Sequence, residues 1–390
     1  MSREIVDVRV HPLSVPLGRA FWMSLEPYTV AAEIVVEIEA DDGSVGIGEI
    51  HGRPQGEIVR VLERFKALLV GEDPLDTGRL SERLFRQTFS RESHGLAAAD
   101  GQPHFGPGGR PEMMAAIAGI DIALWDLKAK AAGLPLWKLL GGRRSAVPAY
   151  ASGGYYGRDG EAAVAELVAE MRGYRELGFD AVKMKVGGLP LAEDVERVRA
   201  VREELPGLRL MLDANCAYDV VAAIEAARAF EPFDIHWLEE PVAWFDPVFG
   251  LARVGAATSI PLASGERELH RFACRDLVDH TPIRYLQFDC TRAGGVTEWL
   301  HVASYALAHG VQMAPHHDPQ IHGHLVAAAE NGYLLEVFPN EERDPIWGAL
   351  FAVRPDIVAG EVLLSDRPGL GLELDYDFVG RFATRTEAKP

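Results

Sequence analysis

The sequence predicts an α/β protein: a modified (β/α)8 barrel of the (β/α)7β type with an α+β capping domain. From residue 147 onward, eight short apolar strands alternate with seven helical segments over about two hundred residues. No glycine-rich phosphate loop follows any of these strands, which disfavours the alternative of a doubly wound open sheet. We therefore predict an N-terminal capping domain at 1–140, the barrel at 141–354, and a C-terminal segment at 355–390 that returns to the capping domain.

The N-terminal part mixes strands and helices. Residues 4–16 and 31–50 are rich in β-branched residues and predict strands, with a turn signal at Asp41-Asp42-Gly43. Between them, the aromatic-bearing segment 21–29 is expected to be a loop, either a surface connection or a lid that excludes water. Helical periodicity covers 57–70, 76–89 and 112–140, and the Gly-, Pro- and His-rich segment 90–110 predicts a long loop.

The barrel elements follow from the alternation of apolar runs and helical periodicity. The predicted strands are 147–151, 181–186, 208–213, 235–239, 260–264, 285–289, 311–314 and 334–336. The predicted helices are 161–177, 192–204, 220–230, 247–254, 268–279, 296–309 and 320–330. A helix after the last strand is expected to be missing or modified.

Composition limits the possible partners. The net charge of −19 argues against a nucleic acid and against an anionic membrane surface. A small anionic substrate would then need a local positive centre. Three cysteines are too few for a disulfide framework and suit a reducing compartment. The N-terminus lacks a signal-peptide core, and no apolar run approaches the ~20 residues of a membrane span, so we expect a cytoplasmic protein.

Two lysines lie on one face of the predicted strand 181–186. Side chains alternate across a strand, so Lys183 and Lys185 point one way and the apolar residues between them point the other. A buried ammonium is costly, and burial lowers its pKa toward the range in which the amine is a base. The alternative is an edge strand with a solvated lysine face.

A polar residue stands at or just beyond the end of every predicted strand from the second onward. The spacing between them is close to one βα unit each time, and the ends of barrel strands form one rim, so these side chains are expected to meet at one mouth. They are Lys185, Asp213, Glu239, Glu266, Asp289, His316 and Glu336.

Three acids from neighbouring strands predict a metal site. Oxygen ligands with positions left open for water and substrate suit Mg²⁺, so Asp213, Glu239 and Glu266 are its candidate ligands. Each acid alone could instead be the N-cap of the next helix.

The other polar residues predict acid–base chemistry. The metal and the neighbouring ammonium should depress lysine pKa, which suits Lys185 as a proton acceptor and Lys183 as a carboxylate-positioning group. On the other side, Asp289 should fix the tautomer of His316 in a second acid/base pair. Glu336, if protonated, could donate a hydrogen bond to a developing oxyanion.

The stretch 314–324 contains four histidines and suggests a competing zinc site. His322 and His324 are two residues apart in a predicted helix start and do not share a face. We therefore interpret His317, His322 and His324 as structural or outer-shell groups.

These motifs together resemble the enolase superfamily, and within it the mandelate racemase subgroup. The segment 119–142 also resembles the part of that family just before the barrel. The resemblance implies Mg²⁺ bound by Asp213, Glu239 and Glu266, and a homo-oligomer. It implies Lys185 and the Asp289–His316 dyad as the two acid/base groups, with Glu336 as the electrophilic partner. Loops of the capping domain near Trp22 and His51 would close over the substrate. The matching motifs are Lys183-Met184-Lys185, Asp213-Ala214-Asn215, Glu239-Glu240-Pro241, Gly265-Glu266, Asp289 with Gly294-Gly295-Val296, and His316.

The resulting hypothesis is a Mg-dependent lyase. It would abstract the proton α to a carboxylate and eliminate the β-hydroxyl of an acid sugar, an aldonate or aldarate, to give a 2-keto-3-deoxy acid. Trp22, His51 and Asn215 are its candidate substrate-binding residues. Two alternatives remain: a racemase or epimerase of a 2-hydroxy acid with the same bases, and a catalytically silent metal-binding protein. The identity of the acid is left to the loops 20–30, 50–56 and 90–110.

Overall fold

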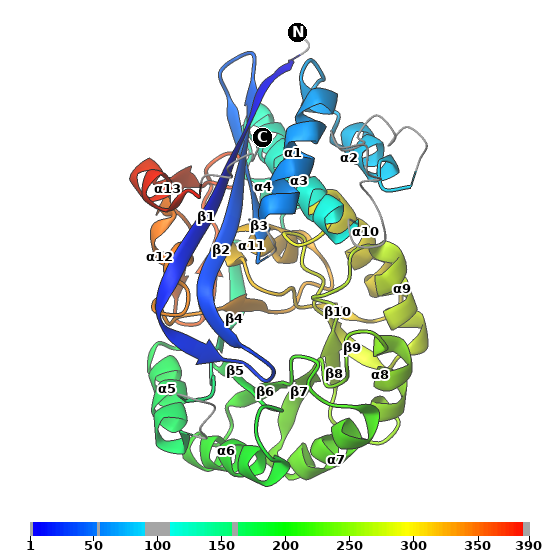
Figure 1. Ribbon diagram of the computed structural model, residues 1–390, viewed down its shortest axis with the longest axis vertical. Coiled ribbons are helices and arrows are strands. Elements are labelled where there is room, and N and C mark those ends of the chain that lie inside the picture. Colours follow the sequence, from blue (N-terminus) through cyan, green and yellow to red (C-terminus); the bar gives the residue numbers. More distant parts are fainter. Residues whose placement is uncertain (1–2, 53–54, 90–109, 158–162, 385–390) are drawn as a thin grey trace.

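The barrel is built from eight parallel strands (Figure 1). The computed structural model describes residues 3–52, 55–89, 110–157 and 163–384; the predicted loop 90–110 therefore lies, except for residue 110, outside the described residues. The strands run in the order β10-β9-β8-β7-β6-β5-β4, with β11 beside β4 and a parallel bridge from Met313 to Gly332 between β10 and β11. The predicted fold class is confirmed. The strands are β4 (Ala146–Ser152), β5 (Ala181–Lys185), β6 (Arg209–Asp213), β7 (Ile235–Glu239), β8 (Leu262–Ser264), β9 (Ile283–Leu286), β10 (Gln312–Met313) and β11 (Leu335–Val337).

Helices on the outside of the barrel cover the strands on one face, while apolar side chains fill the interior. Strands buried on both faces need apolar residues on both, which explains why β5 is buried throughout. An inner cluster around Tyr150, Met211 and Trp237 fills the barrel below its mouth. The helices are α5 (Val164–Glu176), α6 (Leu191–Glu204), α7 (Val220–Phe230), α8 (Pro247–Gly255), α9 (Arg271–His280), α10 (Gly295–Ala308) and α11 (Pro319–Ala328); the short α12 (Pro345–Ala349) takes the place of a full helix directly after β11.

The capping domain is a three-stranded antiparallel sheet packed on helices. β1 (Ile5–Trp22), β2 (Pro27–Ala40) and β3 (Val45–His51) pair in sequence order, and α1 (Gln55–Leu69), α2 (Thr77–Arg86) and α3 (Arg110–Ala132) lie with them. Helix α3 approaches β3 so closely that an added Cβ at Gly48 would lie 1.9 Å from the Gly119 carbonyl oxygen. The same helix is bound to the barrel, because Asp121 accepts hydrogen bonds from the backbone and hydroxyl of Thr297 on α10.

Two sequence predictions for this domain need correction. The loop expected at 21–29 is shorter, because β1 and β2 continue as one long hairpin whose turn covers only residues 23–26. The helix expected over 112–140 is interrupted. It ends at Ala132, Gly133 takes a left-handed φ of 67°, and Pro135 cannot continue the helix, so α4 (Leu136–Leu139) begins anew.

The C-terminal segment contacts both parts of the molecule. β13 (Asp356–Val358) and β14 (Glu361–Leu363) extend the barrel at β4, and β12 (Phe351–Val353) pairs with β15 (Glu373–Leu374). The segment also contacts the capping domain: α13 (Tyr376–Phe382) and the residues after it reach β1, where the Thr384 backbone N–H donates to the Pro12 carbonyl, and the Leu370 N–H donates to Asp126 of α3. The domain boundaries at 140/141 and 354/355 stay predictions. Among the described helices, none has the length and apolar character needed to cross a membrane.

Candidate active site

Lys185, Asp213 and Glu239 lie in one row across the barrel mouth. They are register partners at the ends of β5, β6 and β7, so parallel pairing alone places the three side chains next to one another. Glu266 follows β8 directly, and all four residues are at most 5% exposed. The structure thus brings the three predicted metal ligands to one place; their role as ligands stays a prediction.

Lys183 is the central cation of this mouth. Its Nζ lies 2.7 Å from Glu239 Oε1 and 2.7 Å from Glu336 Oε1, and it donates to the Tyr150 hydroxyl at 3.3 Å. Burial lowers the pKa of Lys183, but Glu239 and Glu336 more than reverse this, and the net pKa lies well above its ordinary value. The edge-strand alternative is therefore excluded, since this lysine is fully buried and paired.

Lys185 is paired with Asp213. Its Nζ donates to Asp213 Oδ2 at 2.5 Å, while the other oxygen of Asp213 accepts from the Asn215 backbone at 2.9 Å. Burial lowers the pKa of Lys185, and the attraction of Asp213 outweighs it, so the net pKa is raised. The depressed lysine pKa expected from the sequence assumes a metal ion beside the amine. The attraction of Asp213 raises the pKa of Lys185 instead, so that expectation is wrong for this arrangement of side chains.

The structure brings His316 and Asp289 together; their role as an acid/base pair stays a prediction. His316 Nδ1 lies 2.8 Å from Asp289 Oδ2, which makes Nδ1 the donor and leaves Nε2 free. Asp289 is held in turn by the Thr291 hydroxyl, which donates to its Oδ1 at 2.6 Å. Burial and the Arg292 charge lower the pKa of His316, although Glu266 opposes them, so the imidazole is neutral near pH 7. Arg292 also donates to Glu266 at 3.1 Å.

Glu336 is ionised, contrary to the protonated state considered for it. Burial would raise its pKa, but Lys183 and His316 hold it well below the ordinary value. Its Oε2 accepts from the His317 backbone N–H at 3.1 Å. Glu336 therefore acts here as an acceptor that fixes Lys183, not as a hydrogen-bond donor.

The charge of the mouth fits a divalent cation. Six buried acids face four cationic side chains, and His316 is neutral, so two negative charges are left over. The excess is visible in Glu239, whose pKa is raised to about 8 by burial and by the nearby Asp213, Glu336 and Glu266. The Asn215 Oδ1 oxygen is buried without a partner. The acids are Asp213, Glu239, Glu240, Glu266, Asp289 and Glu336; the cations are Lys183, Lys185, Arg267 and Arg292.

The backbone around the mouth is strained. Five of the eight described non-glycine residues with positive φ follow the barrel strands there. Such conformations persist only where the surroundings enforce them, and they are common at functional sites. These residues are Asn215, Cys216, Glu240, His317 and Asp318.

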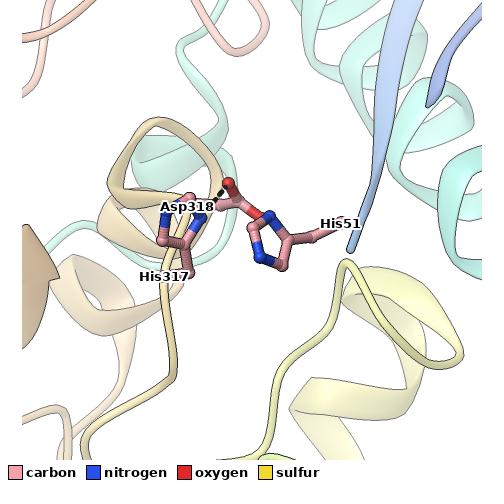
Figure 2. Close-up of side chains that lie close together, drawn as sticks. All are labelled: His51, His317 and Asp318. Carbon is pink, nitrogen blue, oxygen red and sulfur yellow. Dashed lines mark hydrogen bonds and ion pairs between the residues drawn. The ribbon is translucent and has the colours of Figure 1, made fainter. Parts of the chain in front are cut away.

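The predicted substrate-binding residues occupy different positions. Trp22 lies at the tip of the β1–β2 hairpin, which reaches the barrel mouth: its carbonyl accepts from the Tyr156 N–H, and the Ser24 hydroxyl donates to the Val186 carbonyl at 2.6 Å. His51, at the end of β3, is buried against His317, with ring centroids 4.1 Å apart (Figure 2). Asn215 binds Asp213. Substrate contact by these three residues stays a prediction.

His322 and His324 serve the fold, as interpreted from the sequence. His322 accepts from the Cys290 N–H and donates to the His317 carbonyl. His324 accepts from the Trp137 N–H and donates to the Leu370 carbonyl, which joins α11 to the C-terminal segment. With both ring nitrogens used, neither histidine can bind a metal.

The sequence reasoning missed several charged and aromatic residues at the mouth. Arg267 and Arg292 neutralise acids of the site, and their positions directly after Glu266 and three residues after Asp289 were available signals. Tyr155 lies just beyond the end of β4. Its ring lies 5.6 Å from Lys185 Nζ, and its hydroxyl accepts from Arg343 Nε at 2.7 Å. Arg343 carries no local sequence signal.

Family comparisons agree with this arrangement. Residues 5–141 match the family described as mandelate racemase / muconate lactonizing enzyme, N-terminal domain, and residues 165–378 match the one described as enolase C-terminal domain-like. The chain belongs to the mandelate racemase/muconate lactonizing enzyme family. The resemblance to the enolase superfamily is thereby confirmed.

Three relatives of the family cover nearly the whole chain. D-galactarolactone cycloisomerase of Agrobacterium fabrum is 33% identical over 97% of this chain and 98% of its own length. L-talarate/galactarate dehydratase of Salmonella typhimurium is 34% identical over 93% of this chain and 86% of its own. A solved lysine-to-alanine mutant of L-talarate/galactarate dehydratase, liganded with Mg and L-glucarate, has a TM-score of 0.86 at 31% identity, covering 99% of this chain and 93% of that one. The prediction of a magnesium cofactor is confirmed at the level of the family.

Proposed function

We propose that this family member is a Mg²⁺-dependent dehydratase of an acid sugar. The observation that carries the proposal is the pair of proton-transferring groups, Lys185 and the His316–Asp289 dyad, on either side of a mouth with two surplus negative charges. Asp213, Glu239 and Glu266 would hold the ion, which supplies positive charge against the substrate carboxylate as it becomes an enolate. The dehydratases among the relatives support this reading.

The chain's own residues would move two protons. Lys185, as the neutral amine, takes the α-proton, and the electrons of that C–H bond form the C=C bond of the enol. The C–O bond to the β-hydroxyl breaks, and His316, which first takes up a proton at Nε2 because its neutral form carries hydrogen only at Nδ1, delivers that proton, so that water leaves. The enol then tautomerises to a 2-keto-3-deoxy acid. Lys183 faces the carboxylate end, and Glu336 holds Lys183 in place.

A second candidate is a cycloisomerase, favoured by the relative from Agrobacterium fabrum. Here the leaving oxygen is part of a ring, so elimination opens the ring and releases no water. The same two proton transfers suffice. A racemase is the third candidate: the same groups would act, but His316 would return a proton to the α-carbon.

One experiment separates these functions. A panel of aldonates, aldarates and their lactones is incubated in D₂O with Mg²⁺, and products are read by mass spectrometry and NMR. Dehydration appears as loss of water to a 2-keto acid, ring opening as a keto product of unchanged composition apart from deuterium, and racemisation as α-deuterium without a keto product. EDTA should abolish turnover and Mg²⁺ should restore it. The complete absence of α-proton exchange on every acid would overturn the proposal and favour the catalytically silent metal-binding alternative.

The assignment of the bases has its own test. Lys185→Met and His316→Asn each remove one of the two proton-transferring groups, so each should stop turnover. In a substrate that Lys185 deprotonates, His316→Asn should retain α-proton exchange with solvent, because the first transfer is intact. Exchange that survives replacement of both residues would contradict the assignment.

A further inference from the structure

A second cluster of buried ionisable groups lies outside the active site, between the capping domain and the barrel. A small cavity there is lined by Glu33 of β2, Glu49 and His51 of β3, and by Asp318, Gln320 and Asp344 from the barrel side. Its free volume of about 10 Å³ is room for one water molecule or one ion. All six residues are at most 7% exposed.

Two oxygen atoms of this cavity lack partners. Glu33 Oε1 and Gln320 Oε1 are buried, and each belongs to a residue that is only 4% exposed. The remaining polar atoms of the same side chains are bonded: Gln320 Nε2 donates to Glu49 Oε2 at 2.7 Å, and Glu33 Oε2 lies 3.2 Å from His51 Nδ1. An unmet buried acceptor costs about 1–3 kcal/mol, so these two oxygens indicate an absent partner.

The cluster also has the geometry of metal ligands. His51, His317 and Asp318 each place one ligand atom so that all three lie within 4.8 Å of one another (Figure 2). His317 is less suited to a ligand role, because its two ring nitrogens are bonded to Asp318 at 2.7 Å and Asp344 at 3.1 Å. His51 is the better candidate ligand, because only its Nδ1 is bonded, to Glu33 Oε2 at 3.2 Å.

The charge balance of the cluster leaves a place for two positive charges. Burial lowers the pKa of His317, but the charges of Asp318 and Asp344 outweigh it and raise this pKa to about 10, so the cation offsets only part of the charge of four acids. Burial and the neighbouring Asp318 raise the pKa of both Glu33 and Glu49 well above the ordinary value. Four buried carboxyl groups thus face one imidazolium in this cluster, an excess of acid that a divalent cation would offset.

We propose that this cavity is a second divalent-cation site, distinct from the one at the barrel mouth. Glu33, Glu49 and Asp318 would supply carboxylate oxygens, with the Gln320 amide oxygen and the His51 imidazole completing the set. Several oxygens with one imidazole suit Mn²⁺, which accepts both kinds of ligand. The ion would join β2 and β3 to the start of α11, and thereby hold the capping domain against the barrel.

Crystals of the wild-type protein soaked in MnCl₂ test the proposal directly. We expect two anomalous peaks per chain, one among Asp213, Glu239 and Glu266 and one among Glu33, Glu49 and Gln320. A peak at the barrel mouth alone, at a Mn²⁺ concentration that fills that site, would overturn the proposal and leave the cavity to protons or water.

Solution stoichiometry gives a second measurement. Bound Mn²⁺ is counted by EPR during titration of the full chain. We expect two ions per wild-type chain, one in Glu33→Gln or Glu49→Gln, one in Asp213→Asn, and none when the two kinds of substitution are combined. Glu39→Gln is the matched control, because Glu39 is on the same strand as Glu33 but is half-exposed and bound to Arg9. Its count should stay at two.

Thermal unfolding distinguishes the site from a nonspecific one. In Asp213→Asn, which lacks the ligand at the mouth, Mn²⁺ should still raise Tm, since an ion that binds only the folded state stabilises it. The rise should disappear when Glu33→Gln is added. A count of one ion in the wild type, unchanged by Glu33→Gln and lost in Asp213→Asn, would contradict the proposal whatever the Tm.

Discussion

In the proposed mechanism, Asp289 would act through another side chain. It does not need to touch the substrate, because its Oδ2 binds His316 Nδ1 at 2.8 Å and so determines which ring nitrogen faces the mouth. Thr291 and Arg292 fix Asp289 from two sides. A single carboxylate therefore sets both the tautomer and the orientation of the imidazole.

We expect Asp289→Asn to lower kcat/KM by at least about 100-fold, because the amide can stabilise the wrong tautomer and no longer the imidazolium. The pH dependence of the residual kcat should shift toward acid, since the charge that favours protonated His316 is gone. Asp279→Asn is the control: this surface aspartate binds the Tyr305 hydroxyl, and its loss should leave kcat unchanged. An unaltered pH profile in Asp289→Asn would contradict this role.

Arg343 is a buried cation whose partners are aromatic. Its guanidinium carbon lies 3.8 Å from the ring centroid of Phe338 and 4.6 Å from that of Tyr28, and no described acid forms an ion pair with it. Tyr155 connects it to Lys185. A cation without an acidic partner beside the mouth indicates an anionic group on the ligand.

We therefore expect Arg343→Met to raise KM for diacid substrates by about 10–100-fold, the loss of one charge-assisted contact, with little change for monoacids. Steady-state kinetics on matched aldarate and aldonate pairs measures this difference. Arg354→Met, which removes a cation over the Trp347 ring, is the control and should affect neither. Equal effects on both substrate classes would assign Arg343 to packing instead.

At the scale of elements, the long β1–β2 hairpin and α3 make the contacts that join the capping domain to the barrel. The hairpin tip contacts the loop after β5 through Ser24 and the loop after β4 through Trp22, and its base is fixed by the contact of β3 with α3. That contact depends on glycines, because a Cβ at Gly48 would collide with the backbone of α3. The position of the hairpin tip thus depends on the packing of β3 against α3, far from the tip.

Gly48→Ala should lower the free energy of unfolding by about 3 kcal/mol or more, since backbone rather than a flexible side chain must move. Urea denaturation measures it. Gly56→Ala is the matched control: an added Cβ there meets no atom within 4 Å, and the site is in α1, where alanine is the better helix former. Its stability should be unchanged or slightly higher. An equally small change in stability for Gly48→Ala would show that α3 can move away from β3 to make room for the added Cβ.

For the whole molecule, the interface between capping domain and barrel is electrostatic as well as apolar. His317 lies there between Asp318 and Asp344, and its pKa is raised to about 10. A raised folded-state pKa stabilises the fold fully below the unfolded value near 6.5 and loses that contribution as pH rises through about 10. The interface should therefore weaken toward alkaline pH.

We expect the stability advantage of the wild type over His317→Gln to be largest below pH 6.5 and to shrink by up to about 1.4 kcal/mol per pH unit as pH rises toward 10. Chemical denaturation of both proteins across this range, in a metal-free buffer, measures the difference. Parallel curves from pH 6 to pH 10 would show that His317 is uncharged in the fold.

The active-site set and the barrel could both be derived from the sequence, because strand ends recur with the period of the βα unit. Spacing alone placed Lys185, Asp213 and Glu239 at one rim, and the register of β5, β6 and β7 places them in one row. The period is a local property: each strand is apolar along its own length, and each polar residue stands at its own strand's end.

Tertiary structure alone decided the groups that meet from distant parts of the chain. Glu33 and Gln320 meet only when the capping domain packs on the barrel, and Tyr155 and Arg343 meet only when β11 pairs with β4. It also decided the protonation of Glu336 and Lys185, because a pKa depends on burial and on charges that no local pattern records. The sequence by itself determined the barrel and the polar residues that meet at its mouth; the structure decided their charges and the second cluster, since both arise from contacts between segments that the sequence keeps far apart.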